Sequence, residues 1–293
     1  MTAALARAGT PAPTPAANPS ASSAPAVSVS LAKPPPERSS RLLATSGLFG
    51  IDGAVGGGLT PWALIAGYGT DGQVGAVCGI THIGTGDVQL DQTGAAVGLS
   101  DRLELSVANQ HGTILKRTRL GQSVLGLKLR LCGDAVYDQD TWKPQVAFGV
   151  QFKDADGAAF VKSLGARDDK GTDFYLSATK FLLAQRLLLN GTVRATRANH
   201  LGLLGFGTTA SDSYRLELEG SLAYMLNRRT AIGLEYRGKP NRLVLVREED
   251  WKDIFVAFYP RKSVQLTLGF ADLGNIAAFG EQQGLYTSLQ VGF

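Results

Sequence analysis

The sequence predicts an all-β protein: one antiparallel, up-and-down β-barrel that spans a membrane and is closed by its C-terminal strand. Three observations predict it. Apolar and polar residues alternate in many segments, the connections between these segments alternate between tight turns and longer links, and the chain ends on an amphipathic strand whose last residue is Phe293. Because a strand sends successive side chains to opposite faces, each such segment has one apolar and one polar face.

Composition narrows the classes of protein that the chain can form. Glycine accounts for 36 of the 293 residues, and the net charge is only +4 with charged residues at 18%. So small and scattered a charge predicts no nucleic-acid partner. No run of eighteen apolar residues occurs, and the longest candidate, FLLAQRLLL, is interrupted by Gln185 and Arg186. An element that crosses a membrane must therefore be a strand.

Residues 1–40 are predicted to form a disordered tail. Pro, Ala and Ser dominate from Gly9 to Ser40 and aromatic residues are absent, so this stretch cannot build a core. The first eight residues, MTAALARA, are similar to the last part of a secretory signal peptide with a cleavage site near Ala8. On that interpretation the signal begins upstream of Met1; the alternative is a plain disordered N-terminus.

Residues 41–293 form the predicted barrel domain. In chain order, LELSVAN, LGLKLRL, VAFGVQF, YRLELEGSLAY, AIGLEYRG and VQLTLGF all alternate with period two. Segments of about ten residues match tilted membrane-spanning strands rather than the five or six residues of an ordinary globular strand. The hairpin turns fix the register, which places Glu219 opposite Arg237, Leu99 opposite Leu103 and Val97 opposite Leu105.

The connections predict which ends of the strands lie together. Tight turns are expected at 70–72, 100–102, 184–186, 227–229 and 260–262, and longer polar links at 111–121, 154–171, 198–212 and 239–250. Short turns at one end and long loops at the other are typical of outer-membrane barrels.

The number of strands follows from parity. From Pro61 to the C-terminus the chain has thirteen strand-like segments. The first of them ends in a short turn, so if short turns are periplasmic this strand begins on the outer side and another strand must precede it. Arg41 to Asp52 supplies that strand and Gly53 to Thr60 the first outer loop, which gives about fourteen strands. The alternative has twelve, starting at Gln73, with Leu42 to Gly69 folded into the lumen.

The segment DFYLSATKFL fits the pattern less well. If Phe174 and Leu176 face outward, Lys180 does too, and a lysine facing hydrocarbon at mid-depth costs roughly 2–4 kcal/mol. A local helix is the alternative at this position.

The closing strand explains why the chain ends as it does. A closed barrel satisfies every backbone N–H and C=O group without help from lipid, and the last strand must complete the cylinder. Leu285, Leu289, Val291 and Phe293 share one face, a pattern typical of the strand that the barrel-assembly machinery recognises. A soluble β-sandwich that ends on Phe by chance is the alternative.

Four blocks of the sequence resemble a known family. They are GGGLTPWALIAGYGT, GDAVYDQDTWKPQVAFG, LLLNGTVRATRANHLGLLGFG and the closing GLYTSLQVGF. They are similar to bacterial envelope proteins grouped as domain-of-unknown-function family 3034, and the resemblance covers Leu42 to Phe293. It implies an outer-membrane-type barrel of Gram-negative bacteria and supplies no activity, substrate or catalytic residue.

No motif for catalysis, metal binding or a cofactor stands out. GAVGGGLTP has Leu59 where a phosphate-binding loop needs Lys, and the carboxylates of Asp134, Asp138 and Asp140 lack the full calcium-loop spacing. The three histidines fall at loop margins without an adjacent serine nucleophile. We therefore expect no enzyme, no cofactor and no metal.

Charged residues on the inward face are the remaining functional clue. They either line a water-filled path or pair across strands and fill the interior. These lumen-lining candidates are Glu104, Lys128, Arg130, Lys153, Arg194, Arg215, Glu217, Glu219, Glu235 and Arg237.

The sequence thus favours a porin-like passive channel for a small solute in the outer membrane of a Gram-negative bacterium. Its expected partners are outer-membrane lipid and, through the C-terminal strand, the barrel-assembly machinery; no oligomeric state follows. A structural or interaction barrel that displays outer loops such as Asp154 to Gly171 is the alternative, and a barrel enzyme is the least favoured.

Overall fold

The computed structural model describes residues 45–242, 248–276 and 280–293. The chain divides into two units, residues 1–38 and 39–293, and every described residue belongs to the second. The predicted tail, its signal-like start and the first residues of the predicted strand from Arg41 lie outside the described residues.

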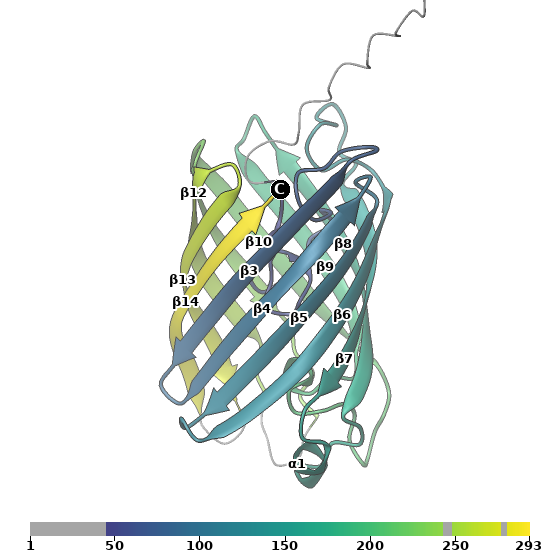
Figure 1. The fold of residues 1–293 in the computed structure, drawn as a ribbon, viewed down its shortest axis with the longest axis vertical. Helices are drawn as coiled ribbons and strands as arrows, with labels where there is room; N and C mark the ends of the chain where they lie inside the picture. The colour runs from purple at the N-terminus through teal and green to yellow at the C-terminus, as the bar shows by residue number, and fades with distance from the viewer. Residues whose placement is uncertain (1–44, 243–247, 277–279) are drawn as a thin grey trace, which may run out of the picture. The chain divides into compact units, whose positions relative to one another are not determined.

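The described residues form a closed antiparallel barrel in which each strand pairs with its sequence neighbours and β14 pairs with β3 (Figure 1). The strands are long, as the alternation predicts. They are β3 (Val74–Thr85), β4 (Val88–Leu99), β5 (Leu103–Ile114), β6 (Thr118–Cys132), β7 (Gln145–Ala155), β8 (Lys170–Leu182), β9 (Leu187–Thr196), β10 (Arg215–Asn227), β11 (Thr230–Arg237), β12 (Trp251–Arg261), β13 (Val264–Asn275) and β14 (Glu281–Gly292).

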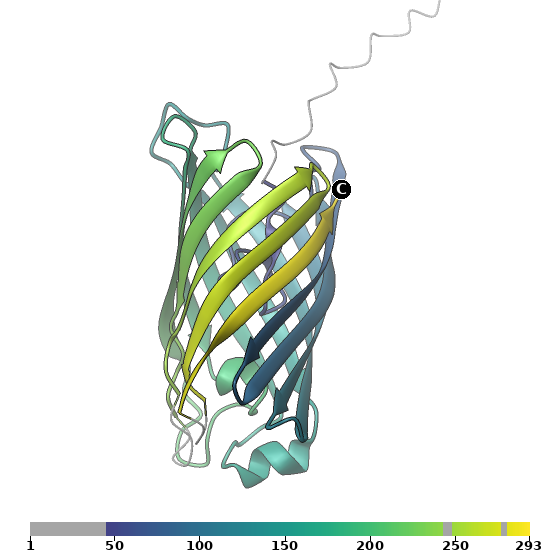
Figure 2. The same ribbon diagram turned by 90° about the vertical axis from the view of Figure 1, so that its left-hand side faces the viewer.

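Within the described residues twelve strands close the barrel, as in the alternative prediction, so the preferred count of fourteen barrel strands is two too high. The residues assigned to the first two strands instead run through the lumen (Figure 2). We call residues 45–69 the luminal segment. Its regular structure is a hairpin of two short strands, β1 (Leu48–Phe49) and β2 (Val55–Gly56). Residues 45–68 are all buried, whereas a lipid-facing strand exposes every second side chain.

The two ends of the barrel differ. The C-terminus lies at the short-turn end, together with turns 100–102, 183–186, 228–229 and 262–263 and the longer link 133–144. The opposite, loop end carries 156–169 with α1 (Ala158–Ser163), 197–214 with η1 (His200–Gly202), and the described connection residues 238–242 and 248–250. The long link predicted at 111–121 is wrong, because β5 and β6 extend through it and leave only residues 115–117 as a turn.

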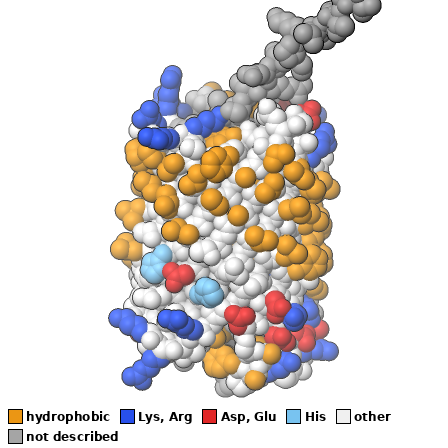
Figure 3. All heavy atoms as spheres, in the orientation of Figure 1, with side chains coloured by type: hydrophobic (Ala, Val, Ile, Leu, Met, Phe, Trp, Pro, Cys, Tyr) orange, Lys and Arg blue, Asp and Glu red, His pale blue; other side chains and the backbone are white. Residues whose placement is uncertain are grey.

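Alternation separates two environments around the wall. Outward positions carry exposed apolar side chains such as Leu125, Leu127 and Leu129, while the residues between them are buried. Figure 3 shows hydrophobic side chains over the upper and middle part of this face, Lys and Arg side chains at both ends, and histidine and most acidic side chains toward the loop end. No helix among the described residues is long and apolar enough to cross a membrane.

The predicted register is confirmed. Glu219 pairs with Arg237 across β10 and β11, and Leu99 and Val97 pair with Leu103 and Leu105 across β4 and β5. The pairings follow from the short turns, since a slip of one residue would exchange the apolar and polar faces.

Lys180 lies in a continuous strand, so the local-helix alternative is wrong. Its side chain is in the outward phase with Leu176, yet the residue is only 6% exposed. Link 133–144 covers it: the Lys180 ammonium donates to the carbonyl oxygens of Asp138 and Lys143. A loop folded against the wall therefore removes the charge from lipid.

The luminal segment approaches the wall where the wall has glycine. A β-carbon on Gly94 of β4 would lie only 2.2 Å from the Phe49 ring, which is fully buried. The contact belongs to an apolar cluster that also contains Val55, Ala66 and Ala108. Glycine at this wall position therefore gives the aromatic ring its space.

We predict that Gly94→Val lowers the free energy of unfolding by about 1–3 kcal/mol, because Phe49 cannot retreat within a packed interior. Guanidinium unfolding of the refolded barrel in micelles measures the change. Gly191→Val is the matched control, since a β-carbon on Gly191 meets no atom within 4 Å. Equal stability of the two variants would contradict this packing argument.

Candidate functional site: the occupied lumen

Wall glutamines bind the backbone of the luminal segment. The segment has little regular structure, so its buried amide groups need partners from elsewhere. A glutamine side chain offers a donor and an acceptor together. Gln290 does both toward Phe49, accepting from its N–H and donating to its carbonyl oxygen. Three more donate to carbonyl oxygens: Gln110 to Ile51, Gln151 to Asp52 at 2.8 Å, and Gln145 to Ala63 at 2.6 Å.

A buried ion-pair network fixes the tip of the segment. The Arg194 guanidinium lies 2.6 Å from the Asp52 carboxylate of the segment and 2.5 Å from the Glu219 carboxylate of the wall. Arg237 approaches the same Asp52 oxygen at 3.1 Å and donates to the Leu59 carbonyl oxygen at 2.7 Å. All four charged side chains are at most 2% exposed. One carboxylate of the segment thus joins two wall arginines.

A second wall pair holds the middle of the segment. Lys128 and Glu104 face each other at 3.1 Å. The Lys128 ammonium donates to the carbonyl oxygens of Val55 and Leu64, and the Glu104 carboxylate accepts the N–H groups of Val55 and Ala66. The pair therefore binds both carbonyl and N–H groups of the segment backbone.

Glu235 holds the following turn. Its carboxylate accepts hydrogen bonds from the Leu59 N–H at 2.7 Å, the Thr60 hydroxyl at 3.0 Å and the Ser221 hydroxyl at 2.7 Å. A β-carbon on Gly57 would lie 1.9 Å from this carboxylate. Glycine at that position lets the backbone approach the acceptor.

A separate polar cluster closes the loop end. The Glu248 carboxylate contacts His200 Nδ1 at 3.0 Å and Lys239 Nζ at 2.9 Å, and the Lys239 ammonium lies 4.7 Å from the centre of the Trp251 ring. Burial alone would raise the pKa of Glu248, but the charges of His200 and Lys239 outweigh it and hold the pKa at about 2. Glu248 is therefore ionised at neutral pH.

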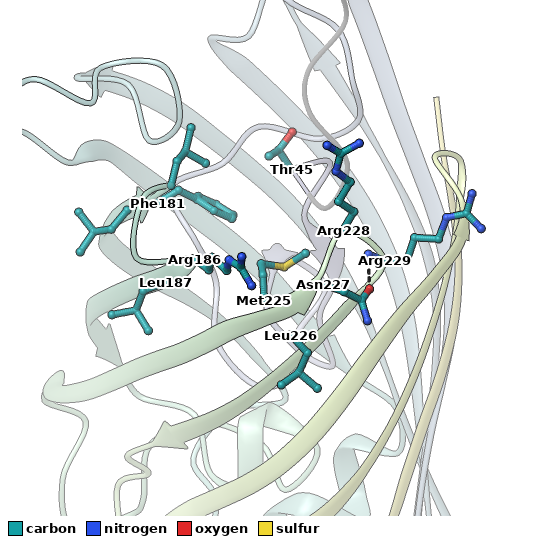
Figure 4. Close-up of a pocket in the computed structure, with 11 residues that line it drawn as sticks. Thr45, Phe181, Arg186, Leu187, Met225, Leu226, Asn227, Arg228 and Arg229 are labelled. Carbon is teal, nitrogen blue, oxygen red and sulfur yellow. Dashed lines mark hydrogen bonds between the residues drawn. The ribbon is translucent and has the colours of Figure 1, made fainter.

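At the short-turn end the barrel surface is hollowed between two turns. Figure 4 shows this hollow of about 860 Å³, with Thr45, the first described residue, at its edge and Met225 within it. Arg186, Arg228 and Arg229 extend around its mouth. The described chain thus enters the barrel beside a hollow with an apolar lining and a basic rim.

The predicted lumen-lining residues separate into two groups. Seven are buried and make the contacts described above or pair beside them, among them Lys153, which binds Asp173 at 2.7 Å. Three lie near the strand ends: Arg130 pairs with Asp101 and Asp134, Arg215 is exposed, and Glu217 is half-buried. The buried seven are Glu104, Lys128, Lys153, Arg194, Glu219, Glu235 and Arg237. Their role in solute passage stays a prediction.

Sequence reasoning missed the partners that the luminal segment supplies. The sequence pattern places Asp52 at the end of a membrane strand, and the wall glutamines carry no charge that would single them out. The alternation itself was the available signal, because Gln110, Gln151 and Gln290 share the inward phase of their strands with the charged set.

The C-terminal strand is placed as predicted. Leu285, Leu289 and Phe293 are exposed on the outer face and Val291 is half-exposed. The Phe293 backbone bonds to Ala76 in both directions and accepts the Tyr68 N–H at 2.8 Å, which links the last residue to both β3 and the luminal segment. Recognition of this strand by the assembly machinery stays a prediction.

The model of a family described as "Protein of unknown function (DUF3034)" matches residues 45–290. The chain belongs to this family. Because the match begins at residue 45, the luminal segment is part of the region that the DUF3034 family shares. No curated protein matches the chain significantly.

Among solved structures, the chain is similar to a KdgM porin at 10% identity and a TM-score of 0.48, over 74% of this chain and 99% of that one. The chain is also similar to a NanC porin at 9% identity and a TM-score of 0.45, over 75% of this chain and 97% of that one. It is likewise similar to an outer membrane channel from Pseudomonas putida F1 at 12% identity and a TM-score of 0.43, over 77% of this chain and 96% of that one.

We predict that Arg194→Met destabilises the barrel by about 3–5 kcal/mol, because Asp52 and Glu219 keep their buried charges without the guanidinium between them. Chemical unfolding followed by tryptophan fluorescence measures the change. Arg215→Met removes an exposed arginine of the same predicted set and should change stability by less than about 0.5 kcal/mol. A comparable loss in both would show that burial of the network contributes nothing.

The loop-end cluster predicts a dependence on pH. The pKa of Glu248 is lowered from 4.5 to about 2 on folding, so its ionised form stabilises the protein fully above about pH 4.5 and this contribution disappears as the pH falls toward 2. The shift corresponds to about 3 kcal/mol. The stability difference between wild type and Glu248→Gln should therefore be larger at pH 7 than at pH 3, measured by unfolding at both values. A difference independent of pH would contradict the assignment.

Proposed function

We propose that the protein is a porin-like channel of the Gram-negative outer membrane, which passes a small solute and is closed at rest by the luminal segment. The membrane assignment is supported by the exposed apolar side chains on alternate outward positions of closed, long strands. Outer-membrane lipid would cover these positions, and β14 would carry the signal for the assembly machinery. The proposed role is passage, not catalysis.

The observation that carries the channel proposal is the ionised inner wall. Lys128, Arg194 and Arg237 are buried there with their carboxylate partners. A barrel interior filled with apolar side chains of similar volume is often as stable as one filled with ion pairs, or more stable, because each buried ion loses its hydration. Charged groups along the inside are, in contrast, what a water-filled path requires. The wall chemistry thus suits a lumen that is at times hydrated.

A second candidate is a permanently filled barrel with a structural or interaction role. It is favoured by the density of bonding to the luminal segment, where Pro61 alone supplies a carbonyl oxygen that accepts from Ser177, Asn190 and Thr192. The two candidates differ in one property, which is whether the segment leaves its position. A reversible covalent lock tests that property.

Thr60 and Ser221 provide the lock. Their hydroxyl oxygens are 2.5 Å apart, close to the roughly 2.05 Å length of a disulfide bond, so cysteines at both positions can join segment and wall. The exposed Cys78 and Cys132 are first replaced by alanine. In planar bilayers, the Thr60→Cys, Ser221→Cys protein should show no channel openings when oxidised and should regain those of the cysteine-free parent after reduction.

Thr60→Cys alone is the control and should conduct in either redox state. Asp52→Asn, which weakens two buried ion pairs of the segment, should open more often than the parent. Openings that persist in the locked barrel would show that solute bypasses the segment. A silent parent together with a silent Asp52→Asn variant would favour the filled structural barrel.

A further inference from the structure

Two carboxylates of the inner wall have no basic partner. Glu235 on β11 and Asp253 on β12 are opposite each other in the register, and they are 4% and 6% exposed. The four carboxylates of the segment-binding networks each contact a Lys or Arg side chain within 4 Å, but within the described ranges neither Glu235 nor Asp253 does. Those four are Asp52, Glu104, Asp173 and Glu219, paired with Lys128, Lys153, Arg194 and Arg237.

The charge balance of the inner wall is therefore uneven. The four basic side chains are matched by the four carboxylates of their own networks, and Glu235 and Asp253 add two negative charges on adjacent strands. An ionised carboxylate without a counter-charge is strongly disfavoured in a buried position. A positive charge at this point would remove the imbalance.

Polar atoms without partners gather at the same place. Both oxygens of Asp253 and the Tyr286 hydroxyl are buried and have no hydrogen-bond partner among the described residues. Nearly all buried polar groups in proteins are hydrogen-bonded, so several exceptions within one region point to a bound species.

The close approach of the luminal segment shows how near two of these groups lie. A β-carbon on Gly58 would be 2.7 Å from the Tyr286 hydroxyl and 3.1 Å from a Glu235 oxygen, so both atoms border one point of the segment. Glu235, Asp253 and Tyr286 thus lie on β11, β12 and β14, on one side of the wall.

Small residues flank Asp253 on its far side. Its partner on β13 is Ala271, and the partner of Ala271 on β14 is Gly284. These two inward positions carry a methyl group and a hydrogen atom, so no long side chain of that row reaches toward the carboxylate.

We propose that this region is a binding site for a divalent, oxygen-preferring cation, with calcium as the best-suited ion. Glu235 and Asp253 supply two negative charges, which match a divalent ion. The Tyr286 hydroxyl supplies a neutral oxygen atom. Calcium accepts irregular sets of carboxylate and neutral oxygens, whereas magnesium demands near-ideal octahedral geometry. No group of three His, Cys, Asp or Glu side chains that could hold a metal occurs in the described part of the chain, so the site also depends on this neutral oxygen.

The test is calcium binding to the refolded, full-length barrel in detergent after treatment with a chelator. Isothermal titration with calcium chloride should show one ion per barrel, and calcium should raise the melting temperature because it binds the folded state. Asp253→Asn should bind at least about ten-fold more weakly and lose the melting shift. Asp91→Asn, which changes an outward carboxylate with a half-exposed side chain, should behave as wild type.

Glu235→Gln is the second variant and should also lose binding, so the test does not depend on one protein refolding. The proposal is overturned if wild type binds no calcium, or if Asp253→Asn and Glu235→Gln both bind it as wild type does. It is also overturned if calcium has no effect on wild type and Asp253→Asn raises the melting temperature. That result would show that the two carboxyl groups repel each other and are relieved by a shared proton, without a bound ion. Binding is measured without current, so the channel proposal can fail while this one holds.

Discussion

The structure depends on satisfying the backbone of an irregular segment inside a closed cylinder. The described part of the luminal segment forms only a pair of two-residue strands, so most of its N–H and C=O groups cannot bond to one another. Some of these groups bond within the segment or to Phe293, but the wall strands use their own backbone groups for the barrel, so inward side chains supply many of the remaining partners. This constraint is one reason why the inner wall carries glutamine, lysine, arginine and glutamate.

The same constraint explains how the charges are arranged. A lysine that donates to two carbonyl oxygens, as Lys128 does to Val55 and Leu64, brings a buried charge that needs a counter-charge nearby. Glu104 supplies it and accepts two N–H groups of the segment in turn. The ion pairs are thus less a source of net stability than a means of matching both polarities of a backbone, since buried pairs approximately balance their loss of hydration.

Local alternation predicts most of the wall and little of what lies inside it. Strand phase depends on residues two positions apart, so the inward set and the register of Glu219 with Arg237 follow from sequence. The luminal segment has no such period, because its residues are held by wall side chains that are far away in the chain. Parity then counted it as two strands. The environment of Lys180 could not be predicted for the same reason, since the strand pattern does not show the loop that covers its charge.

The luminal segment packs against the loop-end connection 197–214, so the two parts cannot move independently. Ile51 and Leu59 of the segment pack in a single apolar cluster with Leu201 and Leu203 of the loop-end connection 197–214. Lys153 joins the two by polar contacts, since its ammonium bonds to Asp173 of the segment-binding network and to the Leu201 carbonyl oxygen. His200, the neighbour of Leu201, belongs to the cluster around Glu248. Withdrawal of the segment would therefore expose apolar surface of that connection and leave Leu201 with fewer contacts, so opening of the lumen has to include rearrangement at the loop end.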